Sequence, residues 1–394
     1  MNLLTLSLAG LRGARLTHAL NILILALGLG TVTLLLLFSS TLTERLTRDT
    51  RGIDLVVGAK GSPLQLVLST VFQADFPTGN IPLEEADAIL RNPMVDYGVP
   101  MALGDAVASF RIVGTTPDYL RLYDATLTRG RLWQRPLEAV LGAETTRHLR
   151  LGIGDTFVSA HGVNDNGDVH RGFPYTVVGI LAPTGSVIDR LALTSVESVW
   201  KVHENLFRLA PPREVTALLL HVRTPLAIVT LPHQINSQTA LQAAVPSFEA
   251  ARLFSLLGFG LAAFRALAGI LIASAGLGIL IALVTRMRER RRELAVLRLL
   301  GASRGKLFAT VLIEAMVLAG IGAAVGLLLG HAAAWALVEW LPSGHALAAM
   351  SVGWQPSEWR IPAVALGIGF LAATIPAVTA YRSEVSSALG GGSE

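Results

Sequence analysis

The sequence predicts an α-helical membrane protein with four transmembrane helices and a large extracytoplasmic α/β domain inserted between helices 1 and 2. Charged residues make up only 15% of the 394 residues, whereas soluble proteins average about 25%. A membrane span needs about 20 mostly apolar residues. Four stretches meet that requirement, at residues 18–40, 256–285, 307–340 and 361–381.

Basic residues beside these stretches predict the orientation of the chain. Arg12 and Arg15 precede the first span, Arg382 follows the last one, and eight of the 32 Lys and Arg residues lie in residues 286–306. Lys and Arg accumulate in cytoplasmic loops. We therefore expect three cytoplasmic segments and two extracytoplasmic ones, namely 1–17, 286–306 and 382–394 inside, and 41–255 and 341–360 outside. The sequence pI of about 9.7 then reflects topology, and no nucleic-acid partner is expected.

The region 41–255 has mixed α/β character. Alternation of apolar and polar residues predicts strands at 53–57, 106–113, 139–141, 156–160, 175–181 and 217–222. Helices are expected at 63–72, with Ser62 as cap and Pro63 in the first turn, and at 83–91. A third helix, 237–256, is expected to lead without a break into the second span as a stalk.

Two stretches resemble catalytic or ligand-binding motifs. The turn at 58–62, sequence GAKGS, follows a strand and precedes a helix, but it lacks the Gly-Lys-Ser/Thr order of an ATP-binding loop. We interpret it as a structural turn, so this chain does not hydrolyse ATP by itself.

The second stretch, 161–170, contains His161, Asp165, Asp168 and His170. Its spacing fits neither a calcium loop nor a zinc motif, and Asn-Gly at its centre is typical of a hairpin turn. We favour an exposed polar tip, and whether these side chains bind a metal stays open. The other histidines are scattered along the sequence. We therefore predict no catalytic residue, metal or cofactor in this chain, although a membrane-bound enzyme remains a third hypothesis.

The third span contains two ionisable residues and a row of glycines, and each of these features has two possible roles. Glu314 is either a gating or coupling contact or an interfacial carboxylate beside Arg304 or Lys306, and for His331 the interfacial interpretation is favoured. A small-xxx-small ridge marks a helix-packing face, either within one subunit or between subunits. Its members are Gly322, Gly326 and Gly330.

The basic segment after the second span has two parts. Topology and contact with anionic lipid account for its first arginines, Arg286, Arg288 and Arg290. Farther along, leucines recur at helical spacing beside charged residues, which predicts an amphipathic helix suited to a partner's groove. Gly301 suits a helix end and Ser303 a cap for the next helix. The residues expected to contact a partner are Arg291, Arg292, Glu293, Leu294, Leu297, Arg298, Gly301 and Ser303.

This segment resembles a known family. RELAVLRLLGAS, residues 292–303, is similar to the E-I-G-I-L-R-A-L-G-A-S segment of MacB/FtsX-like ABC transporter permeases, the group that contains LolC and LolE. Glu314 falls where that family has a carboxylate. Further similarities to its periplasmic core domain lie at Gly130-Arg131, 139–142, 151–155 and 177–181. Near the C-terminus, Val385 stands where the family usually has proline.

The resemblance implies a permease subunit of the bacterial cytoplasmic (inner) membrane. It would form a homodimer or heterodimer and bind two copies of a separate ATPase, which holds ATP and Mg. The segment around Glu293–Arg298 would be the coupling helix, and ATP-driven closure would move the outer domain mechanically. Clients would be lipoproteins, peptides or other hydrophobic molecules, with or without a periplasmic adaptor. The alternative is an FtsX-like signalling or scaffold protein that activates an extracytoplasmic hydrolase or sensor without transport.

Overall fold

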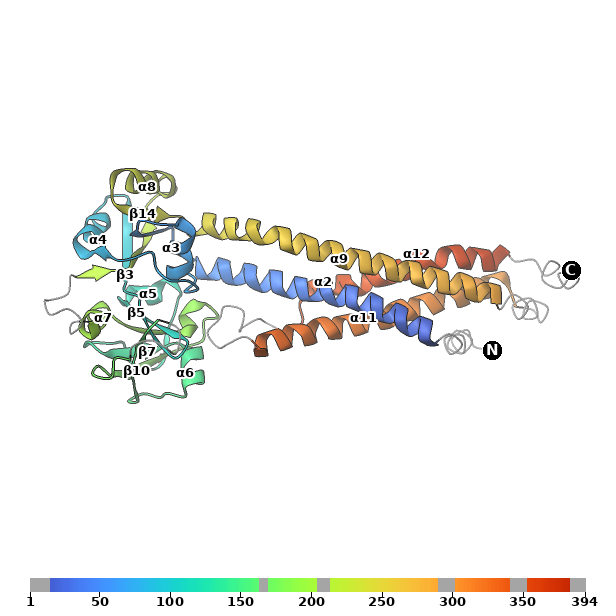
Figure 1. Ribbon diagram of the computed structural model, residues 1–394, viewed down its shortest axis with the longest axis horizontal. Coiled ribbons are helices and arrows are strands. Elements are labelled where there is room, and N and C mark those ends of the chain that lie inside the picture. The colour runs from blue at the N-terminus through green and yellow to red at the C-terminus, as the bar shows by residue number, and fades with distance from the viewer. Residues whose placement is uncertain (1–14, 163–168, 204–212, 290–301, 341–352, 383–394) are drawn as a thin grey trace, which may run out of the picture. The chain divides into compact units, whose positions relative to one another are not determined.

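The computed structural model describes residues 15–162, 169–203, 213–289, 302–340 and 353–382 (Figure 1). Contacts divide the chain into two compact units. We call the first the helical unit, formed by Met1–Ser40, Gly258–Val338 and Met350–Glu394, and the second the α/β unit, formed by Thr41–Leu257 and Glu339–Ala349.

Within the described residues, four helices are long and apolar enough to cross a membrane, as the sequence predicts. They are α2 (Arg15–Asp49), α9 (Pro246–Glu289), α11 (Arg304–Trp340) and α12 (Arg360–Arg382). A short 3₁₀ turn, η4 (Pro356–Trp359), precedes α12. The helices expose large apolar side chains such as Phe259, Leu328 and Leu371, which suits contact with lipid.

Small residues dominate the core of the helical unit. Its buried cluster places Leu25 and Leu29 of α2 against alanines from α9, α11 and α12. Alanine and glycine let helix backbones approach closely, which favours van der Waals packing between membrane helices.

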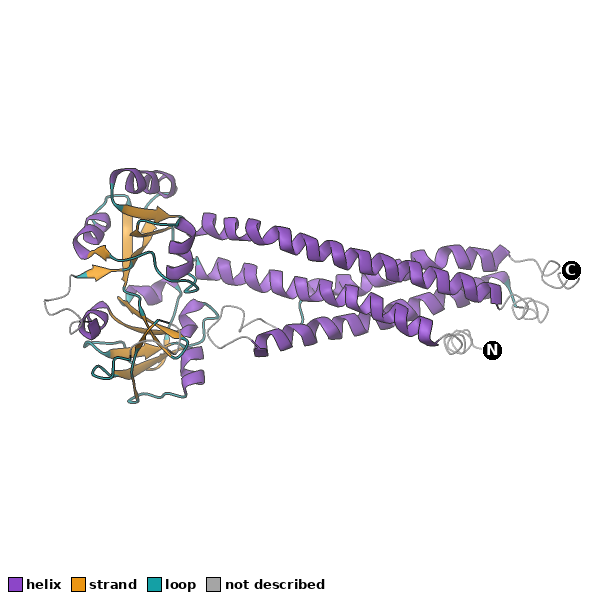
Figure 2. Cartoon of the chain, in the orientation of Figure 1, coloured by secondary structure: helices purple, strands orange, loops and turns teal. Residues whose placement is uncertain are grey.

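Two sheets form the framework of the α/β unit (Figure 2). The four-stranded antiparallel sheet has the order β14 (Leu241–Ala244), β1 (Leu55–Ala59), β13 (Ala217–Val222) and β3 (Val95–Met101). The second sheet is mixed. Its order is β6 (Leu127–Gly130), β10 (Tyr175–Leu181), β7 (Glu138–Leu141), β11 (Leu191–Ser195), β5 (Phe110–Thr115), β4 (Asp105–Val107) and β9 (Ala160–His161), and β8 (Thr156–Phe157) pairs with β10. Another pair joins β12 (Glu214–Val215) to β2 (Ile81–Pro82).

Side chains alternate between two cores along the central strands, as the period of two requires. In β1, Leu55 and Val57 belong to one buried cluster and Val56 to the other. Because both faces of β1 are covered, it is a nearly continuous apolar run. The surrounding helices are α3 (Pro63–Thr70), α4 (Leu83–Leu90), α5 (Asp118–Leu122), α6 (Ala143–Leu149), α7 (Val196–His203) and α8 (Pro225–Gln238), with the 3₁₀ turn η1 (Val187–Arg190).

Several predicted elements are confirmed. The strands 175–181 and 217–222 have the predicted bounds, and Ser62 caps α3 by accepting a hydrogen bond from the Gln65 amide, with Pro63 at the start of the helix. The predicted strand 106–113 is wrong as a single element. It is a hairpin of β4 and β5, turned at Ala108, whose φ of 49° is left-handed.

The predicted stalk helix 237–256 is also wrong in its first part. The chain leaves α8 at Gln238, forms β14 beside β1, and begins α9 only at Pro246. The sequence LQAA of β14 has no β-branched residue, so its extended form follows from pairing with β1 rather than from local propensity.

Candidate functional site

A buried charge cluster joins three helices of the helical unit. Glu314 of α11 forms an ion pair with Arg286 of α9, and its Oε1 atom lies 3.9 Å from Nε2 of His18 on α2. The three side chains are only 5–9% exposed. A carboxylate and a guanidinium hidden together lower the cost of burying either one. We call these residues the charge cluster.

The charge cluster bears on two interpretations made from the sequence. Arg286 is buried against Glu314, so contact with lipid headgroups does not account for its position. Glu314 is buried as well, and its described partners are Arg286 and His18 rather than Arg304 or Lys306. Both pairings join residues from different helices, which sequence spacing does not reveal.

Most of the expected coupling segment lies outside the described residues. This applies to Arg291, Arg292, Glu293, Leu294, Leu297, Arg298 and Gly301. The structure resumes at Ala302, and Ser303 Oγ accepts a hydrogen bond from the Lys306 amide at 3.3 Å. This hydroxyl caps α11 together with the Ser303 carbonyl oxygen, which accepts from the same amide at 3.0 Å.

The three glycines of α11 face α2 within the same chain. A Cβ atom at Gly322 would lie 2.7 Å from Leu25 Cδ2, and one at Gly326 would lie 2.8 Å from Leu29 Cβ and 3.0 Å from the Ala26 carbonyl oxygen. One at Gly330 would overlap Thr33. The two backbones are close enough that side chains at these positions would separate them.

His331 has a partner near the other end of α11. Its Nε2 atom lies 3.5 Å from Oε2 of Glu358, a carboxylate that is fully buried, and its ring stacks on Trp354. Glu358 also caps η4 together with Gln355. The histidine thus belongs to an ordered polar contact within the helical unit.

In the α/β unit, Gly130 and Arg131 lie where the backbone of β6 packs closely against that of β10. Gly130 has a φ of 82°, and a Cβ there would collide with the Val178 carbonyl of the paired strand. Arg131 makes two hydrogen bonds to Glu138, of 2.7 and 2.6 Å. These bonds lower the pKa of Glu138 to about 2.

The turn at 58–62 is structural, as predicted. Lys60 Nζ donates to the carbonyl oxygens of Asn236 and Thr239, at 3.1 and 3.3 Å, and thereby ties β1 to the end of α8. An ammonium used in this way is not presented to a phosphate.

Three histidines that are separated in the sequence lie around the carboxylate of Asp105. We call this group the histidine cluster, and its members are Asp105, His161, His170 and His203. Asp105 begins β4, His161 ends β9, and His203 ends α7. The neighbouring carboxylate raises the pKa of His203, whereas burial lowers that of His170. The predicted ligand candidates Asp165 and Asp168 lie outside the described residues.

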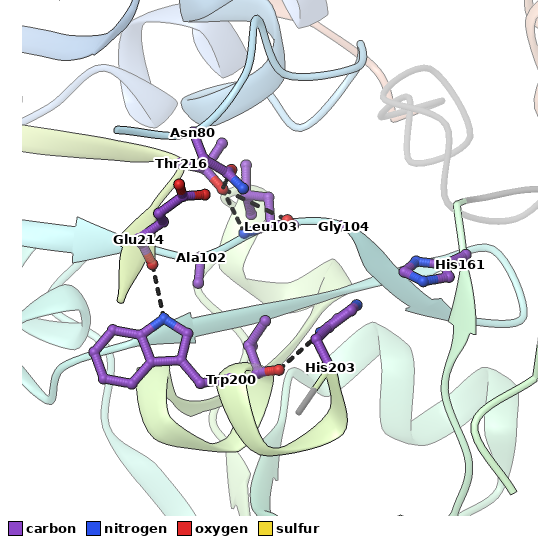
Figure 3. A pocket seen from close by; sticks show the side chains of 10 residues that line it. Asn80, Ala102, Leu103, Gly104, His161, Trp200, His203, Glu214 and Thr216 are labelled. Atoms are coloured by element: carbon purple, nitrogen blue, oxygen red, sulfur yellow. Dashed lines mark hydrogen bonds between the residues drawn. The ribbon is translucent and has the colours of Figure 1, made fainter. Parts of the chain in front are cut away.

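A pocket of about 290 Å³ adjoins this cluster. Figure 3 shows His161 and His203 to the right in the view, with Trp200 and Glu214 to the left. Trp200 is fixed by a hydrogen bond of 2.7 Å from its Nε1 atom to the Glu214 carbonyl oxygen. The sequence pointed to His161 and His170 because they bracket a turn, but it held no local signal for Asp105 or His203.

Comparisons with family models match nearly the whole chain. Residues 18–245 match the MacB-like periplasmic core domain, and residues 265–385 match the FtsX-like permease C-terminal region. The first match alone covers more than half of the chain.

Individual relatives are more distant. The macrolide export ATP-binding/permease protein MacB of Brucella melitensis biotype 1 is 27% identical over 307 residues, which cover 72% of this chain and 46% of that protein. The ABC transporter permease YknZ of Bacillus subtilis strain 168 is 38% identical over 73 residues, or 18% of each chain. This chain thus spans less than half the length of MacB.

Solved structures include two partial matches. The periplasmic region of MacB from Actinobacillus actinomycetemcomitans aligns with a TM-score of 0.35 and 10% identity, covering 52% of this chain and 95% of that one. The extracellular domain of the ABC-type transporter YknZ from Gram-positive bacteria aligns with a TM-score of 0.30 and 11% identity, covering 48% and 98%.

Proposed function

Because this chain belongs to the MacB/FtsX-like family of ABC transporter permeases, we propose that it is the transmembrane subunit of a transporter of the mechanotransmission type. A separate ATPase subunit hydrolyses ATP, and this chain converts the ATPase movement into movement of its α/β unit. The complex contains two permease subunits and two ATPase subunits.

The proposed topology places both termini and residues 286–306 in the cytoplasm of a bacterial inner membrane. The α/β unit is inserted between the first and second spans and lies outside. This orientation is supported by the basic residues at 286–306 and by Arg12, Arg15 and Arg382.

The observation that carries the proposal is the position of the charge cluster. Arg286 lies just before the coupling segment along the chain, and its ion pair with Glu314 connects α9 to α11 beside His18 of α2. A push on the coupling segment therefore acts on three packed helices together. Both α2 and α9 also contain residues of the α/β unit, which gives a continuous backbone path for the movement.

The proposed client is a lipoprotein, a peptide or another hydrophobic molecule that is exported or extracted at the outer face of the membrane. Large apolar side chains on the α/β unit support this class, since Phe76, Leu226 and Phe248 are each more than half exposed. The name of the MacB relative specifies macrolide export, another hydrophobic client.

Co-purification with the ATPase tests the coupling assignment. The charge reversal Glu293→Lys with Arg298→Glu leaves the net charge unchanged but inverts the predicted helix face. We expect it to remove the ATPase from complexes isolated in detergent. The matched control is Arg288→Glu with Glu289→Lys, which reverses one exposed base and one exposed acid at the end of α9.

The control should keep both ATPase subunits. Retention of the ATPase at the wild-type level by the Glu293/Arg298 variant would contradict the coupling assignment. Equal loss in both variants would also contradict it, because the effect would then follow charge near the membrane rather than the predicted helix.

A further inference from the structure

We propose that the α/β unit binds one zinc ion through a carboxylate and three imidazoles, those of Asp105, His161, His170 and His203. The proposal does not depend on transport or on an ATPase. It rests on how these four side chains are arranged and on which of their atoms already have partners.

The distances around Asp105 match a tetrahedral zinc site. Its Oδ1 atom lies 3.3 Å from Nδ1 of His161, 3.6 Å from Nε2 of His170 and 3.5 Å from Nε2 of His203. Zinc bonds to nitrogen and oxygen are about 2.0–2.2 Å, so neighbouring ligands of a tetrahedron are about 3.3–3.5 Å apart. One ligand atom from each residue lies within 4.8 Å of the others, so the ligand nitrogens need to shift by about 1 Å to reach this spacing.

The atoms outside this centre are held in the manner of metal ligands. His203 Nδ1 lies 2.8 Å from the Val199 carbonyl oxygen, a contact that requires a proton on Nδ1 and leaves the Nε2 lone pair facing the centre. Asp105 Oδ2 accepts a hydrogen bond from Ser159 Oγ at 3.2 Å. Ligating histidines and carboxylates are usually oriented by such outer contacts.

Two of the four atoms that face the centre lack a hydrogen-bond partner within the described part of the chain. Asp105 Oδ1 and His170 Nε2 are buried and form no hydrogen bond of acceptable geometry with a described residue. Their side chains are 1% and 8% exposed. Leaving a buried carboxylate oxygen unsatisfied is costly, so an occupant of the centre is expected.

Protons alone do not satisfy this arrangement well. A carboxylate oxygen has two lone pairs, fewer than the three imidazole nitrogens around it. Protonating all three rings would place like charges side by side, since the ring centroids are only 4.6–5.2 Å apart. One central dication interacts favourably with the carboxylate and with all three neutral rings at once.

The ligand set fits zinc and does not suit magnesium or calcium. Three imidazoles and one carboxylate are too nitrogen-rich for magnesium or calcium, which prefer oxygen. Four protein ligands complete a tetrahedron, as in structural zinc sites. Such a site would fasten β4 and β9, at the edge of the eight-stranded sheet, to the end of α7.

Metal binding can be measured on the full-length chain, purified in detergent without a polyhistidine tag. The chain is first stripped of metal with EDTA, and the EDTA is then removed. The affinity for added zinc is measured in competition with a chromogenic chelator. The number of zinc ions bound per chain is measured by inductively coupled plasma mass spectrometry. We expect one zinc per chain and an increase in the melting temperature with zinc.

Three variants and a control make the assignment specific. His203→Ala and His161→Ala should each weaken zinc binding by about 100-fold or more, whereas Ser159→Ala should weaken it about 10-fold, because it removes only an outer contact. The control His233→Ala removes an exposed histidine of α8 and should bind zinc like wild type. His161 is 38% exposed, so its variant should fold normally even if His203→Ala does not.

Two results would overturn the proposal. One is a wild-type chain that retains no more zinc than the His161→Ala variant does. The other is that His233→Ala loses the single zinc ion to the same extent as His203→Ala and His161→Ala, since the metal would then bind elsewhere.

Discussion

Removing one partner from the Arg286–Glu314 ion pair should destabilise the helical unit more than removing both. The perturbation is a double-mutant cycle with Glu314→Leu, Arg286→Met and the combined variant. Both side chains are less than 10% exposed, so each single substitution removes the opposite charge that lies beside a buried charge.

The expected magnitude follows from this burial. Two opposite charges about 4 Å apart attract by about 4 kcal/mol at an effective dielectric constant of 20, and breaking a buried pair costs about 3–5 kcal/mol. A loss of about 4 kcal/mol changes the ratio of folded to unfolded protein by ~1000-fold. The combined variant replaces the pair by apolar side chains, which is often neutral or stabilising.

The assay is unfolding of the full-length chain in detergent micelles, followed by circular dichroism across a denaturant series. We expect both single variants to lose stability and the combined variant to recover most of the loss. Single losses below about 1 kcal/mol, or a combined loss equal to their sum, would refute the reasoning, because the two side chains would then act independently.

Three further predictions concern other contacts. Gly326→Leu should cost about 1–3 kcal/mol in the same unfolding assay, because even a Cβ atom at this position would lie 2.8 Å from Leu29 Cβ. A Cβ atom at Gly320 meets nothing within 4 Å among the described residues, so Gly320→Leu should change the free energy of unfolding by less than about 0.5 kcal/mol. Ser303→Ala should cost about 1 kcal/mol by removing the cap of α11, and Ser303→Asp should restore it. Glu138→Gln should lower the free energy of unfolding by about 1 kcal/mol at pH 7. Since the folded pKa of Glu138 is depressed to about 2 from 4.5, this contribution is full above pH 4.5, and the difference from wild type should vanish as the pH falls towards 2.

The membrane helices could be predicted because their signal is local. An apolar run of sufficient length is visible in the sequence whatever surrounds it, and the four helices are found at those runs. Residues 292–303 were equally informative, since a contiguous motif carries a family resemblance without any tertiary information. The family models bear out that resemblance.

Elements that depend on distant partners could not be predicted. β14 has a sequence, LQAA, that favours helix as much as strand, and only its pairing with β1 selects the extended form. The same holds for the histidine cluster. Asp105 and His203 are far apart in the sequence and come together only when β4, β9 and α7 are assembled.

The two buried carboxylates differ in how their charge is balanced. Glu314 has a guanidinium beside it, a group that is charged at every physiological pH, so the charge cluster is complete without a ligand. Within the described residues, the ion-pair partners of Asp105 are three histidines, which are positive only when protonated. A carboxylate that is 1% exposed therefore has no permanent counter-charge of its own in the histidine cluster. This difference is why the first cluster is interpreted as a mechanical connection between helices, and the second as a binding site for a cation.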